Sequence, residues 1–160
     1  MAKRPGPDFS GLIPELARWN GGAGIDALGW IECVGNYELA AGYSLIFWPA
    51  FVRFEGYVLR DGFSEEALRG FERAGHGRRS VEAVMNHVHI ADIHFNAEAT
   101  DAQLLHLGRV LREIHEAKLA RDFPDLEFTV SFMTASTDRR PCPARSKPRS
   151  ASSEKPSRRT

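Results

Sequence analysis

The 160-residue sequence is poor in the features that define several protein classes. It contains only two cysteines, Cys33 and Cys142, too few for the disulfide framework of a small secreted domain, so we expect both to be reduced thiols. Its most apolar run, residues 39–54, is interrupted by a glycine, a proline and an arginine and falls short of the roughly 20 residues of a membrane helix. Residues 1–10 are polar and lack the apolar run of a secretion signal. These absences predict a cytoplasmic protein without a membrane partner.

Sequence motifs for cofactor binding and nucleophilic catalysis are also missing. The glycines of residues 22–29 do not follow the G-x-G-x-x-G spacing, and they come after an expected helix rather than a strand. Ser44 lacks the second glycine of a nucleophile elbow. Cys33 has apolar neighbours, so we expect an unreactive thiol inside the core. The sequence therefore predicts no cofactor.

The formal net charge of zero conceals a strong asymmetry along the chain. Residues 136–160 contain eight basic and two acidic side chains, net +6, whereas residues 1–135 contain 13 basic and 19 acidic ones, net −6. The last 25 residues include no aromatic side chain and no aliphatic one larger than alanine, so they have nothing to bury. We predict a flexible arm over residues 1–10, a single domain over residues 11–135 and a disordered basic tail over residues 136–160.

Hydrophobic residues make up 42% of the chain, which is sufficient for one core. Short apolar or alternating runs predict strands at residues 30–34, 51–60 and 126–132, and Gly56 is compatible with a bulge in the second of these. Helical periodicity predicts two longer helices at residues 80–93 and 101–121. We predict an α+β fold in which a small, mostly antiparallel sheet is covered by the two longer helices.

Four polar side chains are positioned to accept hydrogen bonds from the first turn of a helix. Asn36 precedes an expected helix at residues 37–44, and Ser64 precedes one at residues 65–74. Ser80 and Thr100 are expected to cap the two longer helices.

A histidine cluster at residues 86–94 is the densest group of chemically active side chains, with three of the six histidines and one aspartate. Apolar residues at positions 81, 84, 85 and 88 favour a helix that continues into it, whereas a strand starting at His87 is the alternative. The side chains with metal-ligand chemistry are His87, His89, Asp92 and His94. On a helix they divide between two faces, so metal binding depends on the strand interpretation.

Polar side chains also interrupt the apolar stripes of both longer helices. Helical projection places Asp92 with the apolar residues of 80–93, with His89 at their edge. The same projection places His115 and Lys118 among the leucines of 101–121. If these helices pack antiparallel, the four side chains meet as candidates for acid–base catalysis. The competing interpretation is a structural ion pair between Asp92 and Lys118.

No catalytic pattern fits in both spacing and context, so we expect a small binding or accessory protein with a protein or small-molecule partner. The first alternative is a metal-dependent or acid–base enzyme that uses His87, His89, Asp92 and His115. The second is weak electrostatic binding of nucleic acid through the basic tail, which lacks the aromatic side chains that would stack on bases.

Overall fold

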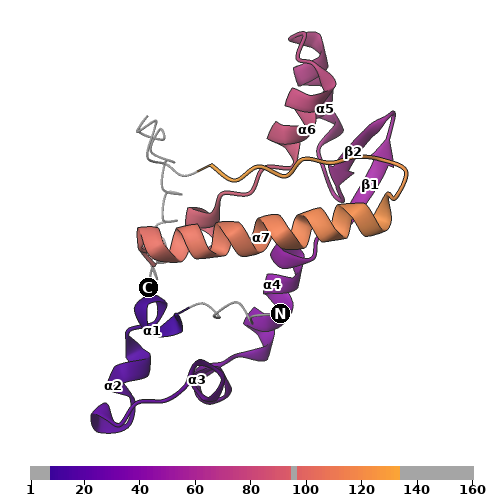
Figure 1. Ribbon diagram of the computed structural model, residues 1–160. Helices are drawn as coiled ribbons and strands as arrows, with labels where there is room; N and C mark the ends of the chain where they lie inside the picture. Colours follow the sequence, from indigo (N-terminus) through magenta and orange to yellow (C-terminus); the bar gives the residue numbers. More distant parts are fainter. Residues whose placement is uncertain (1–7, 95–96, 134–160) are drawn as a thin grey trace, which may run out of the picture.

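Helices dominate the structure, a computed structural model that describes residues 8–94 and 97–133 (Figure 1). In chain order the elements are α1 (Phe9–Leu12), α2 (Glu15–Gly22), α3 (Ala27–Val34), α4 (Tyr37–Phe47), β1 (Phe51–Phe54), β2 (Tyr57–Arg60), α5 (Glu65–Arg73), α6 (Arg78–Met85), the 3-10 turn η1 (Ile90–Asp92) and α7 (Asp101–Asp122). The fold is α+β with a small antiparallel sheet, as the sequence predicts. None of the helices in the described ranges has the length and apolar character needed to cross a membrane. The predicted tail lies outside these ranges.

The sheet is a hairpin of two strands, whereas the sequence predicts one strand over residues 51–60. Phe51 pairs with Arg60 at one end of the ladder, and Phe54 pairs with Tyr57 at the other. Between the strands, Glu55 (φ 47°) and Gly56 (φ 87°) both have positive φ, as the two central residues of a type I′ turn do. The glycine therefore forms a turn and not a bulge.

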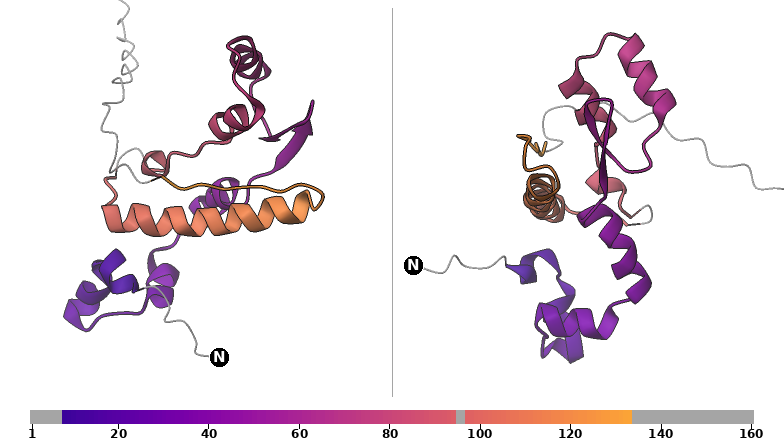
Figure 2. Two further views of the ribbon diagram at one scale, coloured as in Figure 1. Left: turned by 45° about the horizontal axis from the view of Figure 1, so that its top comes forward. Right: turned by 90° about the vertical axis from the view of Figure 1, so that its right-hand side faces the viewer.

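The two faces of the hairpin are buried by different helices. On one face, Val58 packs with Leu119 and Phe123 at the end of α7. On the other face, Leu59 packs with Leu68 of α5 and Val81 of α6. An isolated two-stranded sheet is marginally stable in water, so its stability depends on these two apolar clusters. Helices α1 to α3 lie on the opposite side of α7 from α5 and α6 (Figures 1 and 2).

Three of the predicted helix caps are confirmed. Asn36 accepts a hydrogen bond from the Leu39 amide, and Ser64 accepts one from the Ala67 amide. Thr100 forms a reciprocal capping box at the start of α7. The fourth prediction is wrong because α6 begins at Arg78, before Ser80, and its N-cap position is Gly77.

The strand predicted at residues 30–34 is helical. Its residues belong to α3, which begins after Asp26, whose carboxylate accepts hydrogen bonds from the amides of Leu28 and Gly29. Such capping satisfies two of the amides that a helix start leaves open, and it explains why a short apolar run adopts helical geometry here. Cys33 lies on this helix and is exposed, so the prediction of a core thiol is also wrong.

The helix predicted at residues 80–93 ends at Met85, so both interpretations of the histidine cluster are wrong. Asn86 leaves helical geometry (φ −93°, ψ 2°), residues 87–89 are irregular, and η1 follows. Asp92 in η1 is exposed and does not point into the core. The side chain of Asn86 binds the backbone of β2, which ties the chain to the hairpin where the helix ends.

Residues 126–132 do not form the predicted strand, although the expected alternation of side chains is present. Phe128, Val130 and Phe132 are half-buried, whereas Glu127 and the residues between them are exposed. A strand requires a partner, and the outer edge of β2 is already occupied by the side chains of Glu82 and Asn86. The segment is therefore extended without ladder pairing.

Candidate functional site

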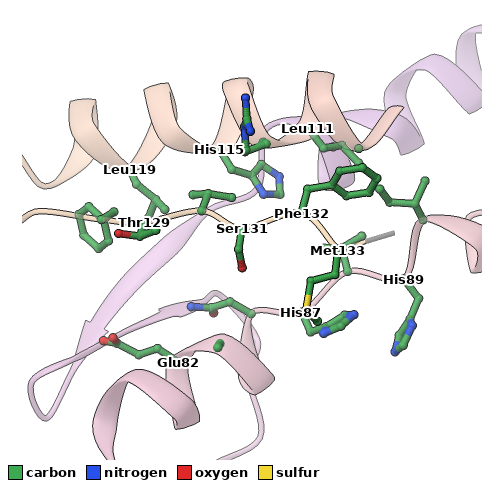
Figure 3. A pocket seen from close by; sticks show the side chains of 18 of the residues that line it. Glu82, His87, His89, Leu111, His115, Leu119, Thr129, Ser131, Phe132 and Met133 are labelled. Carbon is green, nitrogen blue, oxygen red and sulfur yellow. The ribbon is translucent and has the colours of Figure 1, made fainter. Parts of the chain in front are cut away.

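A cleft of about 1280 Å³ lies between α7, the chain from α6 to η1, and the extended segment 127–133 (Figure 3). Leu104 and Leu111 of α7 contribute to its apolar surface. Arg79, Arg112 and Asp101 add charged groups. Pockets for small ligands typically measure about 300 to 1000 Å³, so this cleft has room for a larger ligand.

His87, His89 and His115 line the cleft, so three of the six predicted site residues share it. His87 and His89 are exposed on the wall opposite α7, and their ring centroids lie 4.3 Å apart at an interplanar angle of 31° (Figure 3). These two imidazoles are neighbours that a single ligand could contact together.

The remaining predicted site residues lie elsewhere. Asp92 is exposed and does not line the cleft. His94 is hydrogen-bonded to the Tyr43 hydroxyl of α4, with the two ring centroids 5.6 Å apart. Within residues 8–94 and 97–133, no three His, Cys, Asp or Glu side chains are grouped so that they could hold a metal ion. The four predicted metal ligands therefore do not converge in this structure.

His115 is buried and binds the C-terminal end of α4. Its Nε2–H donates to the carbonyl oxygen of Ile46 over 2.9 Å, and Arg60 Nη2 donates to that of Leu45 over 2.8 Å. The last carbonyls of a helix have no partner within the helix, so these two side chains complete α4. Burial lowers the pKa of His115, the hydrogen bond to Ile46 acts in the opposite direction, and the positive charge of Arg60 lowers it further. His115 is thus a neutral structural donor.

Lys118 is also buried, but its partner is not the predicted one. Its ammonium group pairs with Asp122 one turn along α7 and lies 5.4 Å from the ring centroid of Trp48. The ammonium group holds the pKa of the Asp122 carboxyl below its usual value, with a further contribution from Arg121. The predicted ion pair with Asp92 is therefore wrong. The i, i+4 spacing of Lys118 and Asp122 was a local signal for the observed pair.

Two side chains that the sequence did not single out occupy the outer edge of β2. Glu82 accepts a hydrogen bond from the Val58 amide over 2.9 Å. Asn86 donates to the Val58 carbonyl over 2.8 Å and accepts from the Arg60 amide over 2.9 Å. Their i, i+4 spacing places Glu82 of α6 and Asn86 at its C-cap on the same side, where they act as substitutes for a neighbouring strand.

The segment 127–133 is held by its side chains and not by its backbone. Phe132 packs so closely on Gly108 of α7 that a Cβ atom at Gly108 would collide with the aromatic ring. Phe128 and Val130 pack against the cluster of Val58, Leu119 and Phe123. Among the described residues, no hydrogen bond involves a backbone group of 127–133. Figure 3 shows Thr129 and Ser131 of this segment between α7 and Glu82.

The cleft thus combines apolar surface with polar groups that are open to a ligand. Glu82, Asn86 and His115 already bind backbone atoms, whereas the imidazoles of His87 and His89 and the backbone of 127–133 have no hydrogen-bond partner among the described residues. Such groups can bind a ligand through hydrogen bonds. No protein-family model, curated protein or solved structure matches this chain.

Proposed function

We propose that this protein is a non-catalytic binding protein whose cleft takes up an extended segment of a partner polypeptide. The observation that carries the proposal is the segment 127–133, which lines the cleft and has no backbone hydrogen bond within the described part of the chain. Extended chain with open N–H and C=O groups is a template to which another strand can add. The partner would pair with this segment through its own backbone.

The packing of the segment supports this mode of binding. Half-buried Phe128, Val130 and Phe132 anchor it, so its position does not depend on main-chain hydrogen bonds. A partner strand could therefore pair without first breaking a ladder. In the strand-addition mode, main-chain hydrogen bonds supply affinity and pockets for alternate side chains supply specificity.

The lining of the cleft indicates the chemistry of the partner. Val88, Ile90 and Leu104 offer contacts to apolar side chains, whereas Arg79 and Glu127 offer contacts of opposite charge. An extended segment with alternating apolar and polar residues fits such a surface. The volume of about 1280 Å³ also favours a peptide segment over a small metabolite.

The test begins with photocrosslinking from an unnatural amino acid at Thr129, with the same residue at exposed Glu113 on α7 as the control. The affinity of the partner identified in this way is then measured for proline and alanine variants at Thr129 and at Val130. Because successive residues direct their backbone groups to opposite edges, the two positions test both edges of the segment. Proline removes the amide that a strand needs, whereas alanine retains it.

We expect the proline variant at one of these positions to abolish binding while the alanine variant there still binds. Hydrogen-exchange mass spectrometry should show new protection of residues 127–133 when the partner binds. Thermal melting of each variant shows whether it is folded. Absence of a position-dependent crosslink, equal binding by folded proline and alanine variants, or unchanged exchange would refute the proposal.

The second candidate function is acid–base or metal-dependent catalysis, and the neighbouring rings of His87 and His89 favour it. It predicts near-stoichiometric transition metal in the purified protein or a fall in melting temperature on chelation. The double variant His87→Gln, His89→Gln should then lose the metal or the activity. Under the binding proposal the purified protein contains no stoichiometric metal, and its melting temperature does not change on chelation.

We also propose a cytoplasmic location. The exposed Cys33 thiol is free, and exposed free thiols persist most readily in a reducing compartment. Fractionation of cells that express the tagged protein tests this location, and recovery in an oxidising compartment would contradict it.

A further inference from the structure

A second, smaller cavity of about 440 Å³ lies where the end of α4 meets the end of β2. No residue lines both this cavity and the cleft, so the two are separate. Its volume falls within the range of about 300 to 1000 Å³ that is typical of small-ligand pockets. The apolar part of its wall comes from Leu45, Trp48, Pro49 and Ala50.

Two side chains of opposite charge, Arg60 and Asp61, complete the lining. Among the described residues, neither takes part in an ion pair, either with the other or with a third group. Arg60 uses Nη2 for the Leu45 carbonyl, and Asp61 uses Oδ1 for the Gly62 amide. Within the same part of the chain, Nε and Nη1 of Arg60 and Oδ2 of Asp61 form no hydrogen bond. The cavity therefore offers a cationic donor and an anionic acceptor together.

The environment of Arg60 favours an added carboxylate. The residue is half-buried, and this burial lowers the pKa of its guanidinium group. A cation that is partly removed from water and not opposed by a carboxylate gains most when one binds to it. The bond to Leu45 fixes the guanidinium group in position, so little ordering is needed when a ligand binds.

Trp48 provides aromatic surface beside the two charges. Its side chain is 44% exposed, although Lys118 and Arg121 of α7 lie 5.4 Å and 4.9 Å from the ring centroid. Neither of these cations lines the cavity. Part of the indole therefore remains open to an apolar group of a ligand.

These three features together define the class of ligand. Asp61 would repel a purely anionic ligand, and Arg60 would repel a purely cationic one. An α-amino acid carries an ammonium group and a carboxylate on one carbon, which suits opposite charges supplied by two consecutive residues. We propose that the cavity binds a free α-amino acid with an apolar or aromatic side chain, independently of the cleft. Its carboxylate pairs with Arg60, its ammonium group pairs with Asp61, and its side chain packs on Trp48.

The experiment is a nuclear magnetic resonance titration of the ¹⁵N-labelled full chain with L-leucine, L-phenylalanine and L-tryptophan. The chain has three tryptophans, so three indole N–H signals report on the binding position. The Trp48 signal should shift, whereas those of Trp19 and Trp30, which do not line the cavity, are internal controls. Trp19→Phe and Trp30→Phe assign the signals by elimination.

Variants and ligand derivatives then test each charge separately. Asp61→Ser removes the carboxylate but keeps an acceptor for the Gly62 amide, and Asp92→Ser at another exposed aspartate is the control. Arg60→Gln removes the positive charge and keeps a side-chain N–H donor. N-acetyl-L-phenylalanine lacks the ammonium group, and L-phenylalaninamide lacks the carboxylate. Circular dichroism shows whether each variant retains its helices.

We expect the dissociation constant to rise about 10-fold or more in Asp61→Ser and in Arg60→Gln, because each loses a hydrogen bond between charged groups. Asp92→Ser should bind like the unmodified protein. N-acetylation should weaken binding to the unmodified protein but not to Asp61→Ser, and amidation should weaken it except in Arg60→Gln. An unshifted Trp48 signal with all three amino acids, unchanged affinity in folded Asp61→Ser, or derivatives that bind as tightly as L-phenylalanine would overturn the proposal.

Discussion

Asn86 provides the sharpest test of how the hairpin is stabilised, because both ends of its carboxamide bind the outer edge of β2. Asn86→Ala leaves the Val58 carbonyl and the Arg60 amide without these partners. A buried polar group without a partner costs about 1 to 3 kcal/mol. Val58 is 2% exposed, whereas Arg60 is half-buried and water can replace part of its bond. We therefore expect the free energy of unfolding to fall by about 2 kcal/mol.

Urea denaturation at pH 7 measures this loss, and Glu113→Ala on the exposed side of α7 is the control, expected within about 0.5 kcal/mol of the unmodified protein. Asn86→Asp keeps an acceptor for the Arg60 amide but places carboxylate oxygen against the Val58 carbonyl. It should be less stable than Asn86→Ala at pH 7, and this difference should shrink in acid, where the protonated carboxyl can donate. A loss below about 0.5 kcal/mol for Asn86→Ala, or an Asn86→Asp stability that does not rise in acid relative to that of Asn86→Ala, would refute the edge-capping argument.

The remaining predictions concern polar groups on α7 and the tail. Because burial lowers the pKa of His115, its neutral form stabilises the fold above the unfolded-state pKa near 6.5, and this stabilisation decreases as the pH falls. The urea midpoint should thus drop more between pH 7 and pH 5 than it does in His115→Gln, and equal drops would contradict this assignment. Asp122→Ala should lower the urea midpoint because Lys118 loses its carboxylate, whereas Asp92→Ala should leave the midpoint unchanged. Deleting residues 136–160 should leave the melting temperature unchanged and remove any weak retention on nucleic acid, which should itself disappear in moderate salt. A lower melting temperature would show that the tail contacts the domain.

Helix positions could be predicted where a local signal defines them. Thr100 with Gln103 defines the start of α7, and the apolar periodicity that follows is long enough to exclude a strand. Ser64 similarly defines the start of α5. Helical projection also placed His115 and Lys118 among the leucines of α7, where both are buried. These features depend on residues that lie within a few helical turns of each other in the sequence, so they can be predicted without knowledge of distant contacts.

The sheet could not be predicted in detail because its pairing depends on distant residues. Alternation within 126–132 correctly indicates which side chains turn inward, but it does not show that Glu82 and Asn86 occupy the edge of β2. The turn at Glu55 was missed because asparagine or aspartate is the usual residue before glycine in a type I′ turn. The partners of His115 were equally hidden, since they depend on where α4 crosses α7.

Four polar side chains of this chain bind backbone groups for a common physical reason. Short helices and a two-stranded sheet leave a large share of their backbone groups at ends and edges, and each buried group needs a partner. His115 and Arg60 supply partners at the end of α4, and Glu82 and Asn86 supply them along β2. A buried histidine such as His115, or a half-buried glutamate such as Glu82, therefore has a structural role in this fold that explains its position without catalysis. The backbone of 127–133 has not received such partners among the described residues, and for that reason the search for function should begin with what binds there.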